Sequence, residues 1–194
     1  MTTPHLILTR LVEDPRDRSV AAILEAMARA IDAGAEVEPE PERRDAATRV
    51  IRSGPLKLPR RADLSLAEGG RTLFCRVESQ LGPPGNAAVV RTAEGFSAEI
   101  ETFRWEAAEV TLRAAQAELN WTPLRRWFLE WFQSRHTELA PDLLGAVHSI
   151  GGPRRVSGGW SLTVDFGSAP VACVTELVQA LAQTGAQSML IGHE

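Results

Sequence analysis

The segment Thr122–Gln133, with the sequence TPLRRWFLEWFQ, carries the strongest structural pattern in the chain. At 100° per residue its large apolar side chains cover an arc of roughly 200°, about twice the stripe that one packing contact requires. Thr122 is a suitable N-cap and Pro123 suits the first helical position, so the segment is predicted to be a helix. Such a helix has two sides to bury, and we expect it either to lie between two layers or to bind a partner.

The segments around this helix predict the architecture of the C-terminal part. A strand is expected before the helix, at 109–115, and an apolar strand after it, at 143–150. A strand at 160–166, a helix at 170–184 and a closing strand at 188–191 complete the series. This β-α-β-β-α-β order is that of a ferredoxin-like unit, in which two helices cover one face of a four-stranded antiparallel sheet.

The region before this unit has a different pattern. Residues 62–115 alternate apolar and polar positions between turn residues, which is typical of an antiparallel β-meander. A strand at 6–12 and an amphipathic helix at 20–33 are expected near the N-terminus. The chain is therefore predicted to be an α+β protein, with a central antiparallel β-meander, a C-terminal ferredoxin-like unit and helices packed on the sheet.

Composition divides the chain into three parts. Residues 1–35 form the N-terminal strand-helix unit, residues 36–61 a charged, Pro-rich connector, and residues 62–194 the antiparallel sheet that runs into the ferredoxin-like unit. One compact domain is expected overall. In the connector, glutamates alternate with prolines and a run of arginines follows. Because proline and clustered like charges oppose compact packing, the connector is predicted to be solvated and loosely docked.

Charge and hydropathy narrow the classes of partner. The formal net charge of −4 gives the chain no general attraction for nucleic acid, whose binders concentrate positive charge. No stretch reaches the roughly 18 apolar residues that a membrane span requires. The first residues do not resemble a secretory signal, which predicts a cytoplasmic protein. We therefore expect neither a nucleic-acid partner nor a membrane.

Two motifs resemble parts of catalytic sites, but neither has the full set of residues that its pattern requires. Residues 147–152, VHSIGG, resemble the nucleophile elbow of α/β-hydrolases, and Asp165 and His193 follow Ser149 in that family's order. A valine stands where the family has its first glycine, and only 16 positions separate Ser149 from Asp165. His136-Thr137-Glu138 is similar to the H-x-E of zinc deaminases but lacks the cysteine pair. No catalytic residue is predicted.

Metal and cofactor sites are not predicted either. The four histidines show no close spacing that indicates a shared metal ion, and each is expected to be a surface or boundary residue. The two cysteines are far apart in the sequence and are expected to be buried structural thiols. We therefore expect no bound metal and no cofactor.

A loop rich in glycine is the best candidate for an anion site. Residues 151–159 offer backbone amides and two guanidinium groups to a phosphate or carboxylate. The candidate anion-binding residues are Gly152, Arg154, Arg155 and Ser157. They support one hypothesis, that the chain is a small anionic-ligand-binding protein or an enzyme that uses this loop.

The leading hypothesis is instead a non-catalytic, protein-binding module. Tryptophan and arginine are preferred anchors of protein interfaces, and the helix at 122–133 has apolar positions beyond one core stripe. The interface candidates are Trp121, Arg125, Leu129 and Phe132. The expected partner is a second copy in a homodimer or a distinct protein, for example in an antitoxin, immunity or adaptor role. No known family is identified from these motifs.

Overall fold

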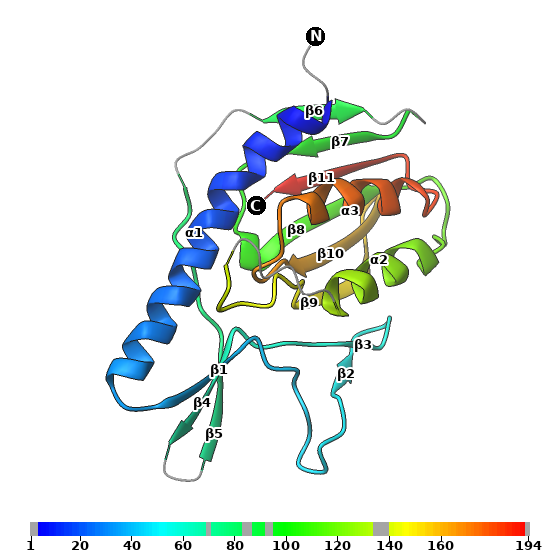
Figure 1. Cartoon of the computed structure of the whole chain (residues 1–194). Helices are drawn as coiled ribbons and strands as arrows, with labels where there is room; N and C mark the ends of the chain where they lie inside the picture. Colours follow the sequence, from blue (N-terminus) through cyan, green and yellow to red (C-terminus); the bar gives the residue numbers. More distant parts are fainter. Residues whose placement is uncertain (1–3, 69–70, 83–86, 92–94, 134–139, 193–194) are drawn as a thin grey trace.

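A six-stranded mixed sheet with two helices on one face organises the fold in the computed structural model of the chain (Figure 1). The structure describes residues 4–68, 71–82, 87–91, 95–133 and 140–192. The elements in chain order are α1 (Pro4–Asp32), β1 (Glu36–Pro39), β2 (Arg52–Ser53), β3 (Leu58–Pro59), β4 (Leu64–Glu68), β5 (Arg71–Cys75), β6 (Ala88–Arg91), β7 (Ser97–Ile100), the short 3-10 helix η1 (Trp105–Ala107), β8 (Ala108–Arg113), α2 (Thr122–Gln133), β9 (Ser149–Val156), β10 (Gly159–Asp165), α3 (Ala172–Ala182) and β11 (Ser188–Gly192).

The large sheet has the strand order β6-β7-β11-β8-β10-β9. β11 runs parallel to β7, whereas the other neighbouring pairs in this sheet are antiparallel. Alternate residues of the strands face the same side of the sheet. Four of them are almost completely buried in one cluster with residues of α2 and α3: Val110, Leu112, Leu162 and Val164. The described residues therefore form a mixed α/β protein with its main core between this sheet and the two helices.

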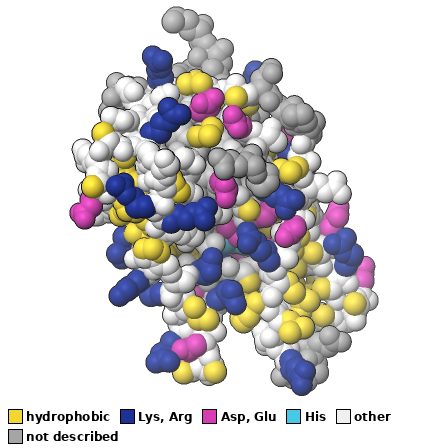
Figure 2. Space-filling model, turned by 180° about the vertical axis from the view of Figure 1, so that it is seen from behind, with side chains coloured by type: hydrophobic (Ala, Val, Ile, Leu, Met, Phe, Trp, Pro, Cys, Tyr) yellow, Lys and Arg dark blue, Asp and Glu magenta, His cyan; other side chains and the backbone are white. Residues whose placement is uncertain are grey.

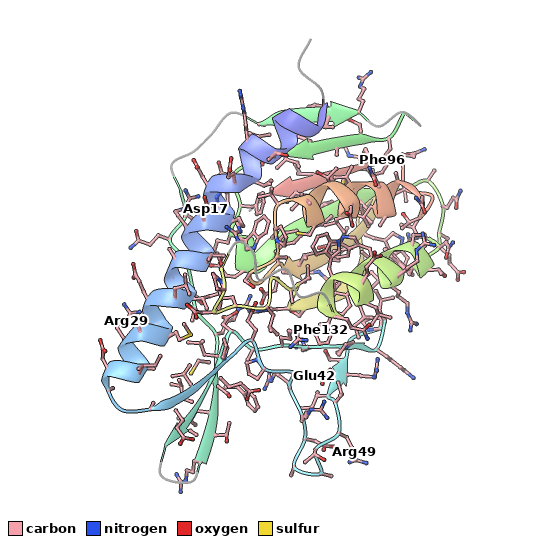
Figure 3. The ribbon with its side chains drawn as sticks, in the orientation of Figure 1. Asp17, Arg29, Glu42, Arg49, Phe96 and Phe132 are labelled. Carbon is pink, nitrogen blue, oxygen red and sulfur yellow. The ribbon has the colours of Figure 1, made fainter. Side chains whose placement is uncertain are left out.

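The helix predicted at 122–133 is present as α2, and it is buried on two sides. Trp127 and Phe128 pack in the main core, where the indole Nε1 of Trp127 donates a 3.0 Å hydrogen bond to the carbonyl of Cys173. Phe132 is also buried, beneath the guanidinium group of Arg61, which lies 4.5 Å from the ring centroid. Figure 3 shows Phe132 between the helix layer and the segment that carries Glu42 and Arg49.

The N-terminal strand predicted at 6–12 is wrong, because α1 runs continuously through this region and through Pro15. Burial explains the helix: Val12 lies in the main core, whereas Val20 and Ile23 lie in a second cluster with Leu64. One helix that reaches both clusters buries more apolar surface than a helix that ends at Pro15. Across the described ranges, no helix has the combination of length and apolar character that spanning a bilayer requires.

The β-meander prediction is only partly correct. β6 and β7 pair as antiparallel neighbours in the large sheet, as expected. β4 and β5 instead form a separate three-stranded sheet with β1, in the order β1-β4-β5. This smaller sheet and the β2–β3 pair lie below the large sheet in the view of Figure 1. The segment 36–61, expected to be a solvated connector, thus contributes strands.

Candidate functional site

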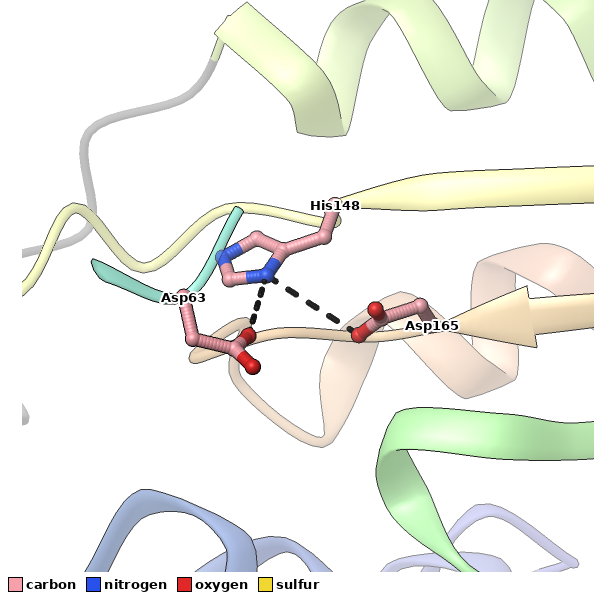
Figure 4. A group of neighbouring side chains, drawn as sticks. All are labelled: Asp63, His148 and Asp165. Carbon is pink, nitrogen blue, oxygen red and sulfur yellow. Dashed lines mark hydrogen bonds and ion pairs between the residues drawn. The ribbon is translucent and has the colours of Figure 1, made fainter. Parts of the chain in front are cut away.

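A fully buried histidine, His148, lies immediately before β9, among three carboxylates. The Nε2 atom of His148 is 2.6 Å from Oε1 of Glu40, and its Nδ1 atom is 2.9 Å from Oδ1 of Asp63. The same Nδ1 atom is 3.9 Å from Oδ1 of Asp165, as Figure 4 shows. We call Glu40, Asp63, His148 and Asp165 the carboxylate–histidine cluster. The expectation that His148 is a surface or boundary residue is wrong, since its side chain is 0% exposed.

Strand ends bring these four residues together. Glu40 follows β1, Asp63 precedes β4, and Asp165 is the last residue of β10. The backbone N–H of Glu40 donates to the carbonyl of Asp63 at 2.8 Å, and that of His148 donates to the carbonyl of Asp165 at 2.9 Å. The cluster therefore lies where the small sheet, through β1 and β4, meets the ends of β9 and β10.

Glu40 holds the chain before β9 in place. Its Oε1 atom accepts hydrogen bonds from the backbone N–H of Ser168 at 3.2 Å and from the hydroxyl of Ser168 at 2.6 Å. Its Oε2 atom accepts from the backbone N–H of Leu144, and Gly145 donates to the Ser168 hydroxyl oxygen at 2.9 Å. Side chains thus satisfy these N–H groups. The strand predicted at 143–150 therefore begins only at Ser149, although the residues before it are largely buried.

The backbone of Glu40 has an uncommon conformation. Its φ angle is 48°, in the left-handed region that residues with a side chain rarely adopt. A backbone in this region is strained, and the strain persists only where surrounding interactions fix the residue. Strained residues of this kind are frequent at functional sites. At Glu40 the contacts to His148 and Ser168 supply that fixation.

The cluster shifts the pKa values of its members. Burial alone would lower the pKa of His148, but hydrogen bonds to Asp63 and Glu40, with the negative charges of Glu40 and Asp165, raise it to about 10. Burial opposes ionisation of Glu40, yet its hydrogen bonds and its attraction to His148 hold the pKa of that carboxyl below its usual value. His148 is therefore an imidazolium at neutral pH, and both ring nitrogens donate.

The pKa of Asp165 is shifted in the opposite direction from the pKa of Glu40. Burial raises the pKa of the Asp165 carboxyl to about 6; the positive charge of His148 opposes this shift and the negative charge of Asp63 adds to it. A buried carboxyl that titrates close to neutrality beside a cavity is a common property of functional sites. Asp165 is the member of the cluster that both shows this property and lines a cavity.

That cavity has a volume of about 170 Å³. Asp63, Asp165 and Ser149 line it from the ends of the strands, and four arginines line it as well: Arg43, Arg60, Arg61 and Arg76. On the face of the molecule opposite to α2 and α3, Figure 2 shows Lys and Arg side chains gathered across the middle, with Asp and Glu side chains between them. We call the cavity that these four arginines line the arginine-lined cavity.

Two of the four arginines are held by the protein itself. The guanidinium group of Arg61 donates to the carbonyls of Glu40, at 2.7 Å, and of Phe132, at 3.1 Å and 3.3 Å. Arg76 donates to the carbonyl of Glu106, and its Nη2 atom is 3.9 Å from Oδ2 of Asp165. These contacts fix the two positive charges beside the carboxylate–histidine cluster.

The other two arginines retain donors for a ligand. Arg43 and Arg60 lie on neighbouring segments, joined by a 2.8 Å backbone hydrogen bond from Arg43 to Arg60. The guanidinium group of Arg43 lies over the ring of Phe74, 5.6 Å from its centroid. Within the part of the chain that the structure describes, the guanidinium groups of Arg43 and Arg60 form no ion pair or side-chain hydrogen bond.

The predicted anion loop at 151–159 is not a loop, because β9 and β10 form a hairpin across most of it. Arg154 pairs in register with Ser161, and Arg155 with Trp160, so the two arginines point to opposite faces of β9. The guanidinium group of Arg155 lies over the ring of Trp160, 4.9 Å from the centroid. The structure therefore does not bring Arg154 and Arg155 together around one anion. Of the other two candidates, Gly152 lies within β9 and Ser157 is exposed in the turn.

The predicted interface residues do not form one exposed apolar patch. Arg125 is exposed, Leu129 is half-buried against the main core, and Phe132 is buried. Trp121 is half-buried and packs edge-on against Trp160, with ring centroids 5.3 Å apart. The expectation that α2 has apolar surface left over is therefore wrong for Phe132, because Arg61 and the core cover it.

Of the three residues in the hydrolase-like order, the structure describes two, Ser149 and Asp165. Ser149 and Asp165 are register partners on β9 and β10, and both line the arginine-lined cavity. His193 and the residues His136–Glu138 lie outside the described residues. Sequence reasoning missed Glu40 and Asp63, which lie far from His148 in the sequence. The one local signal was the apolar stretch around His148, which indicates burial and hence a requirement for hydrogen-bond partners.

Comparisons of the chain with protein-family models, with curated proteins and with solved structures found no match in any of the three.

Proposed function

We propose that the chain binds a small ligand that carries a phosphate or carboxylate group in the arginine-lined cavity. The observation that supports this proposal is the meeting of four arginines at one cavity, two of them with uncommitted guanidinium groups. A guanidinium group presents a planar fork of donors that matches the oxygens of phosphate and carboxylate. Arg43 and Arg60 are the residues that would contact the ligand directly.

The size of the cavity limits the ligand. A volume of about 170 Å³ is smaller than the 300–1,000 Å³ typical of sites for drug-sized molecules. It corresponds to roughly five or six water molecules at liquid density. Inorganic phosphate or the charged end group of a small metabolite matches this volume, with any larger part of the ligand outside the cavity.

Titration calorimetry with inorganic phosphate tests the proposal. Replacing both Arg43 and Arg60 by alanine removes the uncommitted donors, and we expect phosphate affinity to fall at least tenfold. The matched control is an Arg154→Ala/Arg155→Ala variant, which changes the net charge by the same amount and should bind as the wild type does. Equal binding by all three proteins, or loss in the control alone, would contradict the proposal.

Protein binding through α2 stays a separate, less supported proposal. Arg125 is exposed and Leu129 is half-buried, so these two residues support it. Phe132 no longer supports it, because its ring is covered within the chain.

We also propose a ferredoxin-like arrangement for the C-terminal part. It is supported by the antiparallel order β11-β8-β10-β9, with α2 after β8 and α3 after β10. Both helices lie on one face of these strands (Figure 1).

A further inference from the structure

We infer that Asp63, His148 and Asp165 form a binding site for a divalent transition-metal ion at the inner end of the arginine-lined cavity. This inference goes beyond anion binding and concerns different residues. The three side chains come from three separate segments of the chain, and one ligand atom of each lies within 4.8 Å of the others. Figure 4 shows the imidazole with one ring nitrogen directed at both carboxylates.

The distances between these atoms suit a single ion after small movements. Nδ1 of His148 is 2.9 Å from Oδ1 of Asp63 and 3.9 Å from Oδ1 of Asp165. Ligand atoms about 2.1 Å from one tetrahedral Zn²⁺ ion lie about 3.4 Å apart. The ligand atoms of Asp63 and Asp165 lie within 4.8 Å of each other. Side-chain rotations that change these three distances by at most about 1.4 Å would therefore bring all three atoms to one ion.

Glu40 has the position expected for a carboxylate that orients a metal-binding histidine. Metal-ligating histidines almost always donate their second ring N–H to a carboxylate, a carbonyl or water, which fixes the orientation of the ring. Oε1 of Glu40 accepts from Nε2 of His148 at 2.6 Å, and Ser168 in turn donates to that oxygen. Nδ1 thus faces Asp63 and Asp165. Glu40 is a positioning residue in this arrangement and does not touch the ion.

The charge of the cluster favours a cation. With the carboxyls of Glu40, Asp63 and Asp165 ionised and the imidazole protonated, the four residues carry a formal charge of −2, and all are at least nine-tenths buried. Arg76 is the nearest guanidinium group to Asp165, at 3.9 Å. A divalent ion replaces the Nδ1 proton, which leaves to solvent, and the formal charge becomes −1.

The donor set indicates the class of ion. One imidazole nitrogen with two carboxylate oxygens suits Zn²⁺, Co²⁺ or Mn²⁺ better than Mg²⁺ or Ca²⁺, which prefer oxygen ligands throughout. Asp63 and Asp165 also line the cavity, so the ion has a path from solvent and positions left for water or an anion. The inferred metal site and the proposed anion site would then share one cavity.

Visible absorption spectroscopy with Co²⁺ alone tests this inference on the full chain after treatment with a chelator and removal of the chelator. We expect saturable binding of one Co²⁺ per chain, displacement by Zn²⁺ but not by Mg²⁺, and release of about one proton per ion in weak buffer. An Asp165→Asn variant should bind at least tenfold more weakly. The amide oxygen of the asparagine can still accept the hydrogen bond that the backbone N–H of Gly167 donates to Asp165. The substitution therefore preserves this local contact.

Three controls separate the site from adventitious binding. Glu78→Gln removes a carboxylate that is 74% exposed and should bind Co²⁺ as the wild type does. Replacing the three other histidines by glutamine should also leave the absorption bands unchanged. Glu40→Gln should weaken binding without abolishing the bands.

Absence of saturable binding, wild-type affinity in Asp165→Asn, or loss of binding with the three other histidines would each overturn the inference. Because the probe is the metal alone, these outcomes do not depend on whether phosphate binds.

Discussion

The charge of His148 helps to keep Glu40 ionised inside the protein, because it lowers the pKa of that carboxyl. A carboxylate taken out of water costs several kcal/mol unless a partner compensates it, and here each ring nitrogen of His148 faces one carboxylate. Asp165 lies farther from the ring and receives weaker compensation. At the residue scale, the four members of the cluster are therefore unequal, with Asp165 the one whose charge is least well compensated.

Replacing Asp165 by asparagine should stabilise the metal-free protein at neutral pH. The pKa of Asp165 is about 6 in the fold against an ordinary value of 3.8, so the folded state binds more protons than the unfolded state between these values. Stability is therefore lost as the pH rises from 3.8 to 6. A neutral asparagine avoids this loss, which amounts to at most about 3 kcal/mol.

Urea denaturation in the presence of a chelator, at pH 3.5 and at pH 7.5, measures this difference. The free energy of unfolding of Asp165→Asn should exceed that of the wild type clearly at pH 7.5. The difference should shrink at pH 3.5, where both side chains are neutral in the folded protein. A difference that does not change with pH would show that the Asp165 carboxyl has an ordinary pKa in the folded protein.

At the scale of the element, α2 shows what the sequence predicts and what it misses. The apolar arc of 122–133 correctly predicted a helix with two sides to bury, and lying between layers was one of its two expected outcomes. The second layer was missed because it comes from the segment 36–61. Its alternating charges and prolines are typical of a solvated connector, yet its last residue, Arg61, donates a hydrogen bond to the carbonyl of Phe132 and covers the Phe132 ring.

Truncating Phe132 should therefore destabilise the monomer itself. Its side chain is 3% exposed, and removal of a buried aromatic ring costs about 3–5 kcal/mol. Leu129→Ala, at a half-buried position on the same helix, should cost clearly less. Chemical denaturation of the two variants at equal concentration gives both values. A Phe132→Ala variant with wild-type stability would return this ring to the candidates for a partner interface.

At the scale of the whole molecule, the sequence was sufficient for both helices and the closing strand of the C-terminal part, but not for the bounds of β9 or for the site. The helices at α2 and α3 and the closing strand β11 follow from local periodicity, which a short window contains. The carboxylate–histidine cluster joins residues up to 125 positions apart, from Glu40 to Asp165, and no local pattern encodes such contacts. The same holds for the arginine-lined cavity, whose walls come from Arg43, the segment 60–63 between β3 and β4, β5 with Arg76 after it, and the strand ends at Ser149 and Asp165.

The geometry of the molecule therefore supports one central claim, that the arginine-lined cavity is where a ligand binds. The most direct measurement is NMR of the arginine side-chain Nε–Hε groups during titration with inorganic phosphate. The account predicts saturable shifts at Arg43 and Arg60, with Arg154 and Arg155 unchanged. Shifts confined to Arg154 and Arg155, or no saturable shift at any arginine of the cavity, would contradict it.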